Sequence, residues 1–153
     1  MKRPLEACKL VSVTPPQAIK DNASWTTGEI DTKDWDHLTL IVYLGATDIA
    51  VAAMTVTESD TSGSGHANVT GLIAGTSTNI DGSTSALPTA TDDNKFQVFE
   101  IDLRGRKRYI DLTFTAGDGT AGTYAAVLGI LSSPKANAPI SISDRGCDEI
   151  LRV

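Results

Sequence analysis

The amino-acid sequence predicts an all-β protein: a single antiparallel β-sandwich of the jelly-roll or Greek-key type, with about eight strands and extended terminal arms. The first indication is composition, since 19 threonines and 13 glycines accompany only 3 phenylalanines, 3 tyrosines and 2 tryptophans. The branched Cβ of threonine favours strands, and glycine favours turns. The second indication is that apolar and polar residues alternate with the two-residue period of a strand, in segments separated by turn residues.

The length of 153 residues suits one domain with a core of its own. We expect an N-terminal arm (1–18), a sandwich domain (19–131) and a C-terminal tail (132–153) that packs on the domain or on a neighbour. Residues 9–13 have the pattern of a strand, and Pro15 and Pro16 exclude a helix after them. Residues 19–30 alternate only weakly.

The strongest strand signal covers residues 38–44. One face of this strand holds Leu38, Leu40, Val42 and Leu44, and the other holds Thr39, Ile41 and Tyr43. The second face is too apolar for open solvent, so the strand is expected to be central in its sheet or covered on both faces. Residues 49–58 are the next predicted strand, and a short turn at 46–48 would join the two in a hairpin.

Signals in the middle of the chain are weaker. The segment 59–65 is rich in serine and glycine and is expected to be a flexible loop. Residues 68–73 and 78–80 are predicted as short strands. Residues 83–94 are polar and contain a proline, which indicates a long exposed loop.

The second half contains three clearer strands. They cover 96–103, 109–116 and 123–131, and the last is apolar on both faces, which predicts a place in the middle of a sheet. Residues 96–103 alternate, with Gln97, Phe99, Ile101 and Leu103 on one face and Phe96, Val98, Glu100 and Asp102 on the other. In 109–116, Ile110, Leu112, Phe114 and Ala116 are expected to face the core, with Asp111 on the outside. The glycine-rich segment 117–122 is predicted as a hairpin turn. Residues 144–153 are predicted as a short helix or a docked strand.

Charge narrows the classes of partner. The net charge of −6 disfavours binding to nucleic acid and to anionic membranes. No stretch approaches the roughly 20 apolar residues of a membrane helix. The first residues carry charge without an apolar run behind them, so no secretory signal is expected. Cys8 and Cys147 are then expected to be free thiols.

Residues that could carry catalysis are few. His37 and His66 are the candidate imidazole bases, and His66 follows a predicted mobile loop, where a nucleophile is hard to hold in place. Glu100 and Asp102 share a strand face, with Asp111 expected across a hairpin. The basic residues beside them favour cross-strand ion pairs over a glycosidase pair.

Binding sites for ions and nucleotides are weakly indicated at best. Two cysteines and two histidines far apart do not form a zinc pattern. The loop residues Asp81, Asp92, Asp93 and Asp118 match no calcium loop, and aspartate commonly begins turns. Residues 117–122 match G-x-G-x-x-G, but a strand follows where a dinucleotide site needs a helix. We expect no catalytic residue, cofactor or metal.

Two features favour protein binding. Residues 104–108 contain four cations: Arg104, Arg106, Lys107 and Arg108. Ion pairs within the chain or between subunits are the first interpretation, an acidic protein partner the second, and nucleic acid a distant third. The terminal arms carry apolar residues that either dock on a neighbour or close the chain's own sandwich. These candidate interaction residues are Leu10, Val11, Val13, Ile140, Ile142 and Leu151.

Several segments resemble a family of small virion proteins from tailed bacteriophages and prophages. They are L-G-A-T-D-I-A at 44–50, T-E-S-D at 57–60, D-D-N-K at 92–95, E-I-D-L-R-G-R-K-R-Y at 100–109 and A-G-D-G-T-A-G at 116–122. The resemblance extends from about residue 19 to the end and implies a capsid decoration, or cement, protein. Such proteins sit on the outer head shell, often as trimers, and clamp neighbouring capsomers.

The resemblance further implies the partners and the location. The partners would be the major capsid protein and other copies of this chain, most simply as a homotrimer, and the place of synthesis would be the bacterial cytoplasm. A tail or head-fibre module is an alternative that copy number in the virion would distinguish. A carbohydrate-binding β-sandwich is another, although such modules expose aromatic platforms and this chain has few aromatic residues. A hydrolase would depend on His37 or His66.

Overall fold

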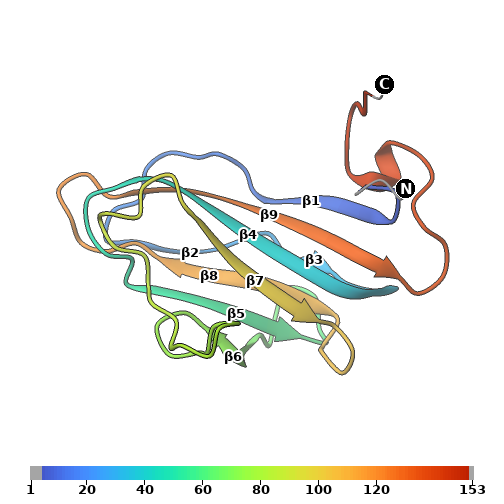
Figure 1. Cartoon of the computed structure of the whole chain (residues 1–153), viewed down its shortest axis with the longest axis horizontal. Coiled ribbons are helices and arrows are strands. Elements are labelled where there is room, and N and C mark those ends of the chain that lie inside the picture. The colour runs from blue at the N-terminus through green and yellow to red at the C-terminus, as the bar shows by residue number, and fades with distance from the viewer. Residues whose placement is uncertain (1–4, 152–153) are drawn as a thin grey trace.

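The computed structural model describes residues 5–151 and confirms the predicted antiparallel β-sandwich (Figure 1). Sheet A contains, in spatial order, β1 (Cys8–Thr14), β9 (Thr123–Pro134), β4 (Trp35–Thr47) and β7 (Phe96–Asp102). Sheet B contains β2 (Ser24–Thr26), β8 (Tyr109–Thr115), β5 (Ala53–Ser59) and β6 (Ala67–Ile73), and the short β3 (Ile30–Asp31) also pairs with β8. A short 3₁₀ turn, η1 (Ser143–Arg145), contacts β1.

The core lies between the two sheets and is built from alternate residues of the long strands. Sheet A contributes Val13, Leu38, Leu40, Val42, Leu44, Phe99, Ile101, Val127 and Leu131, and sheet B contributes Ile30, Met54, Val56, Val69, Ile110, Leu112 and Phe114. This two-residue repeat is the one that strand geometry requires. Trp25 packs against the core by stacking on Phe114, with ring centroids 4.3 Å apart.

The strongest strand signals are confirmed in position and setting. β9 lies between β1 and β4, as expected for a strand that is apolar on both faces. β4 lies between β9 and β7, which confirms the central placement inferred from its sequence. Its outer face is nevertheless not covered within residues 5–151, since Tyr43 keeps 45% of its surface exposed. Packing of the core therefore does not explain the apolar residues on that face.

The predicted hairpins are wrong at three connections. The chain crosses from one sheet to the other between β4 and β5, between β7 and β8, and between β8 and β9. Alternation indicates which side chains face the core, but the pattern is the same whether the next strand joins the same sheet or the facing one. β5 and β6 do pair with each other, and residues 60–66 connect them.

Segments with weak strand signals in the sequence differ further from the predicted structure. Residues 78–80 form no strand, only an isolated bridge between Thr78 and Thr84. Residues 49–52 precede β5 as an irregular connection. The sandwich is also longer than 19–131, because β1 begins at Cys8 and β9 ends at Pro134.

Candidate protein-binding face

Every second residue of sheet A points away from the core, and the register sets these residues in rows across the sheet. Tyr43 lies between Phe96 and Ala126, and the neighbouring row places Ile41 between Val98 and Leu128. Tyr124 precedes Ala126 by two residues on β9 and shares its face. We call this group the apolar face; it consists of Ile41, Tyr43, Phe96, Val98, Tyr124, Ala126 and Leu128.

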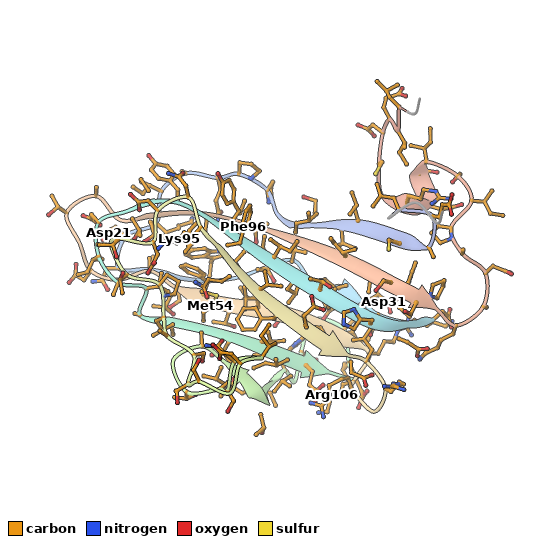
Figure 2. All side chains as sticks on the ribbon, viewed as in Figure 1. Asp21, Asp31, Met54, Lys95, Phe96 and Arg106 are labelled. Atoms are coloured by element: carbon orange, nitrogen blue, oxygen red, sulfur yellow. The ribbon has the colours of Figure 1, made fainter. Side chains whose placement is uncertain are left out.

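The apolar face is open to solvent. Phe96 is 61% exposed, Val98 51%, Tyr43 and Tyr124 45% each, and Leu128 37%. Tyr43 and Phe96 stack on each other with ring centroids 4.8 Å apart, and Figure 2 labels Phe96 at the start of β7 beside Lys95. Because an aromatic side chain presents roughly 200 Å², the three rings alone leave roughly 300 Å² exposed. Contiguous apolar patches of this size often mark interaction sites.

Two open hollows adjoin Tyr43. The larger, about 330 Å³, lies between Tyr43, Leu128 and the exposed pair Pro15 and Pro16. The smaller, about 190 Å³, lies between Tyr43, Tyr124 and Pro16. Both are lined mainly by carbon, so they suit apolar side chains of a partner better than a charged ligand.

The outer face of sheet A changes character along the strands. Beyond Ile41 and Val98, the next rows carry Thr39, Glu100 and His37. Glu100 Oε2 lies 2.9 Å from His37 Nε2 and accepts a 3.1 Å hydrogen bond from the Thr39 hydroxyl. His37 Nδ1 lies 3.3 Å from the Ser132 hydroxyl. This candidate base is therefore tied to a carboxylate on the surface, next to the apolar face.

In the basic turn (residues 104–108), most of the cationic side chains pair with carboxylates of the same chain. Its three arginines face carboxylates in the pairs Arg104–Asp102, Arg106–Glu58 and Arg108–Asp31, and the Lys107 backbone N–H donates to Glu58. The Arg108 pair is bidentate, with N–O distances of 2.7 and 2.6 Å, and these hydrogen bonds lower the pKa of Asp31. The contacts agree with the first interpretation of this cluster, ion pairing within the chain, and they leave little free charge for a partner.

The prediction that the apolar residues of the N-terminal arm are available to a neighbour needs correction. Val13 is buried and Val11 packs against the core, because β1 pairs with β9 and directs these alternate residues inwards. Neither is available to a neighbour. Leu10 lies opposite Ile130 on the outer face and is half-buried. Of the two roles considered for the arm, Cys8–Thr14 takes the one that completes the chain's own sandwich.

The C-terminal tail keeps its apolar residues outside. Ile140 is 86% exposed, Leu151 92% and Ile142 40%. Arg145 anchors the tail by donating a hydrogen bond to the Leu5 carbonyl. Cys8 and Cys147 are both free thiols, and burial raises the pKa of Cys8. The three tail residues remain candidate contacts for a second molecule.

His66 lies at the end of the 60–66 loop, in a cluster of polar side chains. Its Nε2 is 2.9 Å from Glu29 Oε2, and its Nδ1 is 3.3 Å from Asp111 Oδ2, which is an ion-pair distance. Asp111 belongs to β8 on the outer side of sheet B; it is buried and accepts a hydrogen bond from the Thr57 hydroxyl. It does not approach Glu100 across a hairpin, because β7 and β8 lie in different sheets. With both ring nitrogens facing carboxylates, His66 ties the 60–66 loop to sheet B.

The glycine-rich loop between β8 and β9 binds a carboxylate of its own chain. The backbone N–H groups of Thr120, Ala121 and Gly122 donate to Asp48 at 2.6–2.9 Å. Asp21 accepts a further hydrogen bond from Gly119 N. Successive backbone N–H groups form an anion-binding concavity. The match to a phosphate-binding pattern is thus explained by an internal aspartate.

We expect Asp48→Asn to loosen this loop. Hydrogen bonds from Ala121 and Gly122 lower the pKa of Asp48, so its contribution to stability is present above the ordinary carboxyl pKa of about 3.9 and is lost as pH falls through the lowered value. The variant should be less stable than wild type near neutral pH, and the difference should shrink in acid. Urea unfolding near neutral pH and in acid, with amide exchange of residues 120–122, measures this effect. A difference in stability between variant and wild type that stays the same at both pH values would contradict it.

Of the loop aspartates considered for calcium, Asp81 and Asp92 serve as turn residues, and Asp93 holds a distant segment. Asp81 accepts hydrogen bonds from the Ser83 backbone and hydroxyl, and Asp92 accepts from Thr89 and from Lys95 Nζ. Asp93 accepts from the Thr47 backbone N–H. Within residues 5–151, no three His, Cys, Asp or Glu side chains come together as a metal-binding group.

Sequence reasoning identifies part of the apolar face and misses the rest. The alternation of residues 38–44 marks Ile41 and Tyr43 as too apolar for solvent, but it does not connect Phe96, Val98 and Tyr124 with them. The available signal is that residues 123–131 are apolar on both faces. Only the register of β9 and β7 against β4 shows that these side chains adjoin Tyr43.

Neither a model of a known protein family nor a curated protein sequence matches the chain. Among the described residues, no helix is long and apolar enough to cross a membrane.

Proposed function

We propose that this chain is a non-enzymatic structural protein that attaches to a larger protein assembly through the apolar face of sheet A. The observation that carries this proposal is the exposure of Tyr43, Phe96 and Val98 side by side on one surface. The core between the sheets is filled without them. Keeping large apolar side chains in water costs solubility, so a sequence that retains them together needs a partner to cover them.

The assembly we propose is the head shell of a tailed phage, where the chain would act as a decoration protein. This identification rests on the resemblance of residues 44–50, 57–60, 92–95, 100–109 and 116–122 to that family. The aromatic rings expose less than half of the roughly 800 Å² per partner that a stable interface buries, so a single copy would bind weakly and several copies would have to bind together. A shell repeats its binding site many times, and a trimer of this chain would engage several sites together.

The test is to mix the purified chain with expanded heads that lack it and to measure bound protein against free concentration. Wild type should bind with saturation. The double variant Tyr43→Asp, Phe96→Asp should bind at least about 30-fold more weakly, because loss of an interface hot spot costs about 2 kcal/mol or more. Thr61→Asp is the matched control, since Thr61 is exposed in the 60–66 loop that connects two strands of sheet B, and it should bind as wild type.

Failure of the wild-type chain to saturate the heads would overturn the capsid assignment. Equal binding of the double variant would overturn the assignment of the face. Copy number in the native virion separates a decoration protein, present in tens to hundreds of copies, from a tail or head-fibre module, present in few.

A carbohydrate-binding role is the second candidate, because Tyr43, Phe96 and Tyr124 are exposed aromatic rings on one face. The residues between them, Ala126 and Leu128 among others, carry no hydrogen-bonding side-chain groups, whereas sugar sites combine ring stacking with polar contacts. A glycan array with no bound sugar would remove this candidate, and a hit lost on Tyr43→Ala would favour it.

A further inference from the structure

β7 has an open backbone edge. It is the last strand of sheet A and pairs with β4 on one side, and no other strand of residues 5–151 pairs with it. An unpaired edge presents a row of N–H and C=O groups that can accept another strand.

The ladder fixes which groups point outwards. Leu44 N donates to Lys95 O at one end of the pairing, and Leu103 N donates to Asp36 O at the other. Antiparallel strands alternate hydrogen-bonded and non-hydrogen-bonded pairs, so residues 97, 99 and 101 bond to β4. The backbone groups of residues 96, 98, 100 and 102 therefore point away from the sheet, and no backbone hydrogen bond of a turn or loop in the described chain uses them.

The sequence of β7 lacks the usual edge protection, and two hollows lie between residues 97–102 of β7 and the segments 69–74 and 77–80. Natural sheets guard their edges with proline, lysine or a bulge. The other edge strand of sheet A, β1, carries Lys9 and a bulge between Ser12 and Thr14. β7 has the sequence F-Q-V-F-E-I-D and a continuous register with β4.

The residues with outward backbone groups also carry the outer-face side chains of β7. Phe96 and Val98 are exposed and apolar, and Glu100 and Asp102 are exposed and acidic. Asp102 is already paired with Arg104 through both carboxylate oxygens, so Glu100 is the main acidic group open to a basic partner. Glu100 Oε2 contacts His37 and Thr39, while Oε1 has no hydrogen-bond partner within residues 5–151. A strand added to this edge would set its own side chains directly beside these four.

Charge selects the partner. In a symmetric antiparallel pairing of β7 with a second copy, a centre at Glu100 would bring two glutamates together, and a centre at Val98 would place Phe96 against Glu100. Like charges directly opposite are destabilising, and two chains of net charge −6 repel each other. A basic and apolar segment of another protein fits where a second copy does not.

We infer that the open edge of β7 binds an extended segment of the partner protein, antiparallel, with basic residues opposite Asp102 and Glu100 and apolar residues opposite Val98 and Phe96. The inference rests on the proposed function, since this segment would belong to the protein that covers the apolar face. Main-chain hydrogen bonds would provide affinity, and the alternating side chains would provide specificity.

The probe is a synthetic seven-residue peptide, K-T-K-T-V-T-V, with blocked ends, titrated into the full chain by NMR. We expect amide protection and cross-strand contacts at Val98 and Glu100, and at least tenfold weaker binding of E-T-E-T-V-T-V. Glu100→Lys leaves the backbone unchanged and should bring the affinities of the two peptides together or reverse their order. Val98→Pro removes an outward N–H that β4 does not use and should abolish binding, whereas Val98→Thr should retain it.

Peptide binding that is unchanged in Val98→Pro or indifferent to peptide charge would overturn the inference. Concentration-dependent self-association of the wild-type chain that Val98→Pro abolishes would overturn it in favour of a second copy. Binding to heads separates this inference from the proposed function. If the heads bind Val98→Pro as strongly as wild type but do not bind the Tyr43→Asp, Phe96→Asp double variant, the proposed function is supported and the edge site is contradicted. If the peptide binds as expected and the heads bind nothing, the edge site stands and the capsid assignment falls.

Discussion

Replacing Phe114 by alanine is expected to lower the free energy of unfolding by about 3–5 kcal/mol, whereas the same replacement at Phe96 should change it by less than about 1 kcal/mol. Phe114 is fully buried, lies opposite Met54 in the ladder of sheet B and stacks on Trp25. Its removal leaves a cavity in the core. Phe96 is 61% exposed, so its removal takes away little burial and leaves no cavity.

Urea unfolding of the two variants measures this contrast, with the shell-binding assay run on the same samples. Phe96→Ala should keep native stability and lose affinity for the assembly, and Phe114→Ala should do the reverse where it remains folded. A loss above about 2 kcal/mol for Phe96→Ala would mean that the apolar face supports the fold of the single chain. Stability of the single chain would then explain the apolar face, and no partner would be required.

The fold class is predictable because the alternation is strong where the core is built. The segment 38–44 has four leucines and valines at two-residue spacing, and all four are fully buried. Phe99, Ile101, Ile110, Leu112 and Phe114 follow the same rule. Sheet membership is not predictable, because a turn such as 104–108 has the same composition whether the chain doubles back or crosses to the facing sheet.

The candidate binding face is predictable only in part. The sequence shows that Ile41 and Tyr43 are unusual for a solvent-facing side. It does not show that Phe96 and Ala126 flank Tyr43, because that adjacency comes from pairings between segments more than 50 residues apart in the chain. The same holds for His66, whose partners Glu29 and Asp111 lie 37 and 45 residues away in sequence.

Removing the His66 side chain by substitution with alanine is expected to destabilise the protein by about 3 kcal/mol, because it leaves the buried Asp111 carboxylate without the imidazole that lies against it. The imidazole lies between Glu29 and Asp111, and Asp111 is only 7% exposed. Hydrogen bonds from the Gly63 backbone and the Ser62 hydroxyl also hold Glu29 and lower its pKa. The ring thus links the 60–66 loop to sheet B through its contacts with these two carboxylates.

A double-mutant cycle of His66→Ala and Asp111→Asn isolates this link. We expect a coupling energy between about 0.5 and 3 kcal/mol, since the two side chains are in contact. His37→Ala is the matched control: its contact with Glu100 lies at the surface, and exposed pairs contribute at most about 1 kcal/mol. If His66→Ala kept full stability and full protection of the 60–66 loop from amide exchange, the ring would not be a structural link. Its position between two carboxylates would then have to be tested for acid–base chemistry, and the non-enzymatic role proposed for the chain would lose support.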